Sequence, residues 1–160
     1  MEKPDAIVAF GFTKEGEANE HIAIEAKGYS HRWGIPIFTQ NDVARYLSDV
    51  KQPILVAEEN ERYLSTLGIV LAFKEVARHH QWKRVFVIAV PPHLWRCSRD
   101  LRNMGFNVLY DRSYFKEAYQ SSFWYNRKDP QLWVRGRIRW WSREIILRLL
   151  PWKIYSNLTA

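Results

Sequence analysis

The chain has 160 residues, of which 47% are hydrophobic and 26% charged, and its formal net charge is +7. This size and composition are typical of one folded domain with its own core and exclude a disordered chain. Its one cysteine, Cys97, excludes an internal disulfide. No apolar run is long enough to cross a membrane, and the first strand begins too early to leave room for a signal peptide, so we expect a cytoplasmic protein.

The positive charge is concentrated in the second half of the chain. Residues 1–80 contain 9 Lys and Arg against 12 Asp and Glu, whereas residues 81–160 contain 15 against 5. Seven of the eight tryptophans also lie in the second half. A basic, aromatic half indicates either a polyanionic partner, nucleic acid or a membrane surface, or an ordinary basic surface over a tryptophan-rich core.

Short apolar runs alternate with helical patterns along the chain. The predicted strands are 6–10, 35–38, 54–57, 85–90 and 107–110. The predicted helices are 17–33, 41–47, 61–79, 92–103 and 132–150, and residues 111–131 form an irregular loop before the last helix. This alternation predicts one α/β domain over residues 1–160, a Rossmann-like three-layer doubly wound fold with a mostly parallel five-stranded sheet.

Two strands carry further information about their places in the sheet. The run 85–90 is apolar at every position, so we expect a central strand covered on both faces. Pro36 removes a hydrogen-bond donor from the second strand, so it should lie at the start of that strand, or the strand should lie at an edge.

Ligands of such folds bind beyond the carboxyl ends of the strands, and the fourth strand leads into the most suggestive residues. His93 and Arg96 are three residues apart at the start of a helix and so share a face. They are a candidate clamp for a phosphate or carboxylate, and His93 is the candidate catalytic acid or base, because an ordinary imidazole titrates near neutral pH. The alternative is a capping histidine beside a surface arginine.

The exits of the first and third strands supply the other candidate ligand-binding residues. Gly11 and Thr13 are expected to offer a backbone N–H and a hydroxyl donor, Glu58 an acceptor for a hydroxyl or amine, and Ser65 and Thr66 polar contacts. The alternative for the third exit is simple helix capping. The glycine spacing after the first strand fits neither a dinucleotide fingerprint nor a P-loop.

Other reactive residues do not form a recognisable site. His79 and His80 have no ligand-spaced partners, so no metal site is predicted. Cys97 has no evident base beside it and is interpreted as a structural thiol.

The C-terminal segment combines arginines with tryptophans. The arginines are Arg135, Arg137, Arg139, Arg143 and Arg148, and the tryptophans are Trp133, Trp140, Trp141 and Trp152. An apolar stripe runs through Val134, Ile138, Trp141, Ile145 and Leu149. We expect this stripe to pack on the sheet with the arginines outward; the alternative is an amphipathic helix at a membrane or partner surface.

Three segments resemble the YdcF-like/SanA-like family of largely uncharacterised bacterial α/β proteins. They are residues 5–11, Glu58 with Ser65 and Thr66, and residues 85–105, where His93 and Arg96 are the most specific positions. The resemblance implies a Rossmann-like fold, a nucleotide-like charged ligand such as S-adenosylmethionine, and a role in envelope biogenesis. The chain departs from the family pattern at Phe12, where a second glycine is expected, and after Thr66, where Leu67-Gly68-Ile69-Val70 replaces an acid and an amide.

Two functional hypotheses follow from these observations. The first is a small-ligand-binding domain for a nucleotide-like or anionic molecule, in which catalysis is left open. The second is a non-catalytic binding module that uses the basic, Trp-rich half on nucleic acid or an anionic membrane surface.

Overall fold

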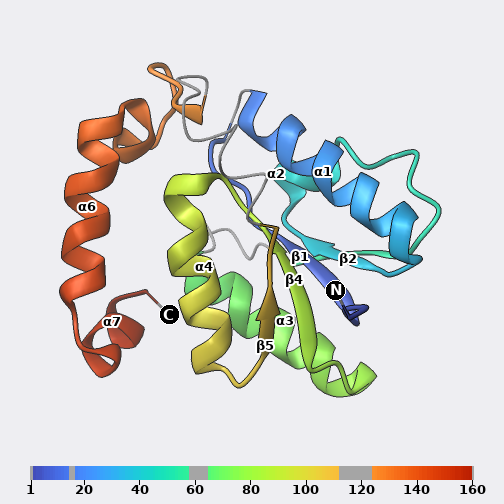
Figure 1. Cartoon of the computed structure of the whole chain (residues 1–160). Helices are drawn as coiled ribbons and strands as arrows, with labels where there is room; N and C mark the ends of the chain where they lie inside the picture. Colours follow the sequence, from blue (N-terminus) through green and yellow to red (C-terminus); the bar gives the residue numbers. More distant parts are fainter. Residues whose placement is uncertain (1, 15–16, 58–64, 112–123, 160) are drawn as a thin grey trace.

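The computed structural model describes residues 2–14, 17–57, 65–111 and 124–159 (Figure 1). The strands are β1 (Ala6–Ala9), β2 (Ile37–Thr39), β3 (Ile54–Val56), β4 (Arg84–Ile88) and β5 (Asn107–Leu109). The helices are α1 (Glu17–Trp33), α2 (Asn41–Ala44), α3 (Thr66–His80), α4 (Pro91–Asn103), the 3₁₀ helix η2 (Leu132–Arg135), α6 (Arg137–Leu149) and α7 (Trp152–Thr159). All five predicted strands are therefore present, each within two residues of its expected bounds.

The sheet is wholly parallel, in the order β3-β2-β1-β4-β5. Helix α1 covers one face, and α3 and α4 cover the other (Figure 1). The predicted doubly wound α/β fold is thus confirmed. The chain winds outward from β1 through β2 to β3 and returns to β4, so the topological switch point, where such sheets bind ligands, lies between β1 and β4.

Alternate residues of the central strands fill two separate cores. Ile7 and Phe86 pack toward α1, while Val8 and Val87 pack toward α3 and α4. Residues 85–88 are all buried, which confirms the prediction that this strand is central. Pro36 directly precedes β2, which lies inside the sheet rather than at its edge. Because the proline stands before the first residue of the strand, its missing N–H costs no hydrogen bond within β2. The carbonyl of Pro36 still accepts from the N–H of Ile7.

Helix α3 begins later than predicted because a serine caps it. The side chain of Ser65 accepts a hydrogen bond from the N–H of Gly68, and the helix starts at Thr66. The predicted first turn over 61–64 lies outside the described residues. Within the described part of the chain, no helix is both long and apolar enough to cross a bilayer.

The predicted C-terminal helix over 132–150 is wrong at its start, while its end agrees within one residue. The segment divides into η2 and α6, separated by the extended residue Gly136, and a further helix, α7, follows Pro151. Pro151 ends α6 because it has no N–H to donate, and its carbonyl accepts from Ile154 and Tyr155 at the start of α7.

The predicted inward stripe of this segment is wrong at three of its five positions, whereas Trp141 is partly buried against the core. Val134 is buried, but Ile138, Ile145 and Leu149 are 86%, 52% and 78% exposed. The opposite face of α6 packs inward through Trp140 and Glu144, which are 2% and 0% exposed.

Polar contacts to α4 explain why α6 presents this face. Glu144 Oε2 lies 3.2 Å from Arg96 Nε as an ion pair, without the alignment of a hydrogen bond, and Trp140 Nε1 donates to the carbonyl of Pro92 at 3.3 Å. In α7, the hydroxyl of Tyr155 donates to the buried carboxylate of Asp100. Buried charges need partners, so these contacts determine the orientation of the C-terminal helices.

We predict that Glu144→Leu strongly destabilises the protein, because it leaves the Arg96 guanidinium charged and buried. The expected loss in free energy of unfolding is roughly 3–5 kcal/mol, measured by urea denaturation. The double variant Arg96→Met/Glu144→Leu should recover most of it. As a control, Glu75→Gln breaks the exposed Glu75–Arg78 pair and should cost less than about 1 kcal/mol. Equal losses in the free energy of unfolding for Glu144→Leu and Glu75→Gln would contradict this account.

Candidate functional site

A pocket of about 160 Å³ lies at the carboxyl ends of β1 and β4, at the switch point of the sheet. It is lined by Gly11, Phe12, Ser65, Thr66, His93, Arg96, Gln131, Trp133, Trp140 and Arg143. The loop after β1 and the first turns of α3 and α4 contribute the first six residues, and the segment from Gln131 into α6 contributes the rest. Five residues proposed from the sequence, namely Gly11, Ser65, Thr66, His93 and Arg96, are therefore brought together here.

His93 is held between two of these residues. Its Nδ1 lies 3.2 Å from Arg96 Nη2, and its Nε2 lies 3.3 Å from the hydroxyl of Thr66. A guanidinium can only donate, so Nδ1 accepts and the neutral ring carries its proton on Nε2, which donates to Thr66. Burial, followed by the charges of Arg96 and Arg143, lowers the pKa of His93 well below its ordinary value.

This arrangement changes the role expected for His93. Both ring nitrogens are engaged with protein atoms, and the ring is neutral at physiological pH. Because the imidazole donates to Thr66 Oγ1, the Thr66 hydroxyl must direct its own hydrogen to another acceptor. His93 therefore orients Thr66 in this geometry, and a catalytic role would require one of these two contacts to open, so that role stays a prediction.

The predicted His93–Arg96 clamp is modified by a partner that lies far away in the sequence. Arg96 is 3% exposed, and its charge is balanced by Glu144. The second guanidinium on the pocket belongs to Arg143, which lies over the ring of Trp133 at 4.7 Å. Arg96 and Arg143 thus bring two guanidinium groups to the pocket, and guanidinium groups favour an anionic group.

Gly11 lines the pocket for a different reason from the one predicted. Its N–H donates to Gln40 Oε1 at 2.7 Å, and the N–H of Phe12 donates to Asn19 Oδ1 at 2.9 Å. A Cβ at Gly11 would lie 3.0 Å from that Gln40 oxygen. The glycine thus permits the close approach of Gln40. We had expected the N–H of Gly11 to bind a ligand, but it is occupied by Gln40.

The remaining predicted residues have mixed outcomes. Thr13 is buried and does not line the pocket, and its hydroxyl has no hydrogen-bond partner within the described ranges. Ser65 lines the pocket but also caps α3, so both interpretations of the third exit apply to it. Glu58 lies outside the described residues.

Sequence reasoning missed the wall that the C-terminal segment supplies. The carboxylate of Asp129 accepts from the N–H groups of Lys14 and Gln131, which fixes this segment beside the β1 exit. The side-chain oxygen of Gln131 is buried and has no hydrogen-bond partner in the described part of the chain. One signal was present: Glu144 is the single acid after residue 130, and an isolated acid in a basic helix indicates a buried partner.

The described residues contain no cluster of three or more His, Cys, Asp or Glu side chains able to hold a metal ion. Cys97 is fully buried, and burial raises the pKa of its thiol well above the ordinary value. It is therefore a protonated thiol packed in the core, which agrees with the prediction of a structural cysteine.

No family model, curated protein or solved structure matches the chain. The YdcF-like resemblance consequently stays a prediction from the quoted residues.

We predict that the neutral state of His93 makes folding stability depend on pH. Below about pH 6.5 the unfolded chain binds a proton at this position that the folded protein does not, so stability falls as pH falls, by at most about 1.4 kcal/mol per pH unit. In His93→Gln, which keeps a donor and an acceptor, this component should disappear.

The measurement is urea denaturation of both proteins at about pH 7.5, 6.5 and 5.5, the range that brackets an ordinary histidine pKa. Carboxylates that titrate in both proteins cancel in the comparison. Parallel stability profiles for the two proteins would contradict a neutral, buried His93.

Proposed function

We propose that this protein binds a small anionic, nucleotide-like molecule in the pocket at the carboxyl ends of β1 and β4. The observation that carries the proposal is the meeting of two arginines, an oriented hydroxyl and aromatic walls in one pocket at the switch point. The YdcF-like resemblance and a cytoplasmic location remain predictions that agree with this function.

The polar groups suit a ligand with an anionic group beside a donor. Arg143 provides a guanidinium for a phosphate or carboxylate, with Arg96 behind it. Thr66 receives the His93 proton and therefore directs its own hydrogen to an acceptor, for which a ligand oxygen is well suited. The buried oxygen of Gln131 would accept from a ligand hydroxyl or amine.

The dimensions limit what can enter. A cavity of roughly 150 Å³ is known to hold one benzene ring, so a pocket of about 160 Å³ takes one ring or one phosphate-sized group. Phe12 and Trp140, whose ring centroids lie 4.6 Å apart, offer edges and faces for a planar ring. A whole S-adenosylmethionine is larger than this space and would place one part of itself inside.

We predict that a ligand found in a thermal-shift screen depends on Arg143 and Thr66. The probes are inorganic phosphate, adenosine monophosphate, S-adenosylmethionine and adenosine, which separate the anionic group from the ring. Loss of a charge-assisted hydrogen bond of about 1.5–3 kcal/mol should weaken binding about 10- to 100-fold in Arg143→Gln, and Thr66→Val should weaken it about tenfold, by calorimetric titration.

The matched control is Arg78→Gln, which removes an arginine from the exposed end of α3 far from the pocket residues. It should leave the affinity unchanged. A hit whose affinity is unaffected by Arg143→Gln and Thr66→Val would place binding elsewhere and refute the proposed pocket.

A further inference from the structure

We propose that the outward face of α6 binds the surface of an anionic lipid bilayer. This face consists of Ile138, Ile145, Ile146 and Leu149, which are 86%, 52%, 62% and 78% exposed. Residues three, four and seven apart share one side of a helix, so these side chains form an apolar strip, interrupted by the exposed Ser142, opposite the buried Trp140 and Glu144. The pocket uses the inner face of α6, so this inference is independent of the proposed function.

Arginines border the apolar strip on both sides. Arg137 and Arg148 are eleven residues, or about three turns, apart and lie along one border, where Arg148 also pairs with Glu144 at 3.4 Å. Arg139 lies along the other border. After residue 130 the single acidic residue is Glu144, which is completely buried. An apolar strip with cationic borders and no exposed acid is the pattern of a helix that lies in a membrane interface.

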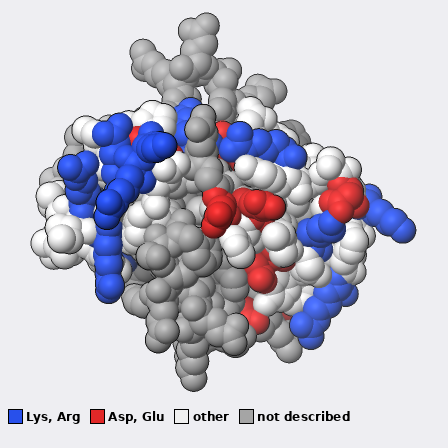
Figure 2. Space-filling view, turned by 90° about the horizontal axis from the view of Figure 1, so that it is seen from above, with Lys and Arg blue, Asp and Glu red and all other residues white. Residues whose placement is uncertain are grey.

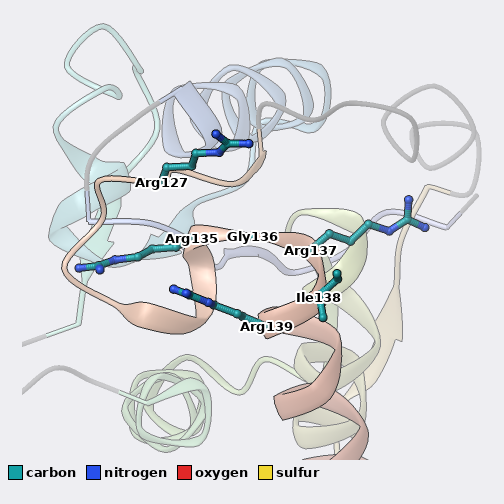
Figure 3. A pocket seen from close by; sticks show the side chains of 6 residues that line it. All are labelled: Arg127, Arg135, Gly136, Arg137, Ile138 and Arg139. Atoms are coloured by element: carbon teal, nitrogen blue, oxygen red, sulfur yellow. The ribbon is translucent and has the colours of Figure 1, made fainter.

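The start of α6 adds a cationic hollow to the same surface. Arg127, Arg135, Arg137 and Arg139 line an open pocket of about 550 Å³ together with Gly136 and Ile138 (Figure 3). Arg135 is held in place because its Nε donates to the carbonyl of Asp129 at 2.6 Å. In Figure 3 the side chains of Arg135 and Arg139 extend to the same side, as two donors for one phosphate group would.

The distribution of charge over the molecule agrees with this placement. Figure 2 looks onto the end of the molecule where the strands exit, and Lys and Arg side chains predominate on the side where α6 begins in Figure 1. Further Lys and Arg side chains lie on the opposite side, among acidic ones. Acidic side chains lie toward the middle and the opposite side of this view. On this face the described residues beside the start of α6 are mainly cationic, which would favour contact of that side with a negatively charged plane.

Aromatic residues continue the surface onto α4. Trp95 is 45% exposed, and the Arg148 guanidinium lies 4.6 Å from the centre of its ring and 5.1 Å from that of Trp141. Trp and Arg side chains are suited to the headgroup region, because each pairs an apolar body with a polar end.

Other partners fit the same surface less well. Nucleic acid would use the arginines but would leave the isoleucines without a role, since its affinity comes from phosphate contacts and base stacking. A second copy of the chain would cover the isoleucines but would bring two sets of arginines together. A bilayer with anionic headgroups satisfies both the apolar strip and its cationic borders.

The test is cosedimentation of the full chain with phosphatidylcholine vesicles and with vesicles of phosphatidylcholine and phosphatidylglycerol. We predict binding to the anionic vesicles, at least tenfold weaker binding to the neutral ones, and weakening with added salt. The double variants Ile145→Ser/Leu149→Ser and Arg137→Gln/Arg139→Gln should each reduce binding at least tenfold.

Two exposed residues on other elements provide matched controls. Ile24→Ser removes an isoleucine that is 56% exposed on α1, and Arg78→Gln removes an exposed arginine of α3. Both should bind vesicles as the unchanged protein does. Urea denaturation should show that all four variants keep their stability within about 1 kcal/mol, since every substituted side chain is at the surface.

The alternative occupants give different results. Binding to single-stranded DNA that needs the arginines but not Ile145 and Leu149, without vesicle binding, would overturn the proposal in favour of nucleic acid. A dimer that Ile145→Ser/Leu149→Ser abolishes, again without vesicle binding, would overturn it in favour of self-association. A rise in the melting temperature of the protein with soluble glycerol phosphate, without binding to anionic vesicles, would indicate that the hollow binds free phosphate. That result would refute the membrane surface.

Discussion

The buried ion pair between Arg96 of α4 and Glu144 of α6 is the constraint on which the C-terminal half of this structure depends. Both side chains are almost completely shielded from water. Glu144 also pairs with Arg148 at 3.4 Å, and it is the carboxylate that balances the buried Arg96. Once Glu144 faces α4, the helical repeat places Trp140 and Arg143 beside the pocket and directs Ile138, Ile145 and Leu149 outward. One electrostatic requirement therefore determines both the wall of the pocket and the character of the outer surface.

The same pair alters the chemistry of the pocket. Because Glu144 balances Arg96, the guanidinium of Arg96 is available to hold His93 Nδ1, and the neutral imidazole in turn orients Thr66. Arg143 then supplies the additional positive charge at the pocket wall. The result is a chain of fixed donors and acceptors that suits binding and orientation of a ligand, and that leaves His93 with little freedom to exchange protons with it.

Much of the fold could be predicted from local patterns. The run 85–90 is apolar throughout, which identified the central strand, and Gly34 and Gly105 follow helices and adopt positive φ angles, as helix-ending residues do. His93 and Arg96 were also identified correctly as pocket residues, because the start of a helix after a parallel strand has a known place in such sheets. The break at Gly136 was missed, since the helical stripe continues across it, and helix α7 beyond Pro151 was not predicted.

The sequence by itself determined the parallel doubly wound sheet and five of the residues that meet at the carboxyl ends of its strands, because helix ends and connection handedness are local or follow general rules. The tertiary structure alone decided which face of α6 turns inward and which groups join the pocket from the C-terminal segment. Amphipathicity shows that a helix has two faces, and an apolar stripe normally indicates the buried one. Here Glu144 pairs with Arg96 and Trp140 donates to the carbonyl of Pro92, both on α4. Those long-range contacts reversed the expected orientation of α6.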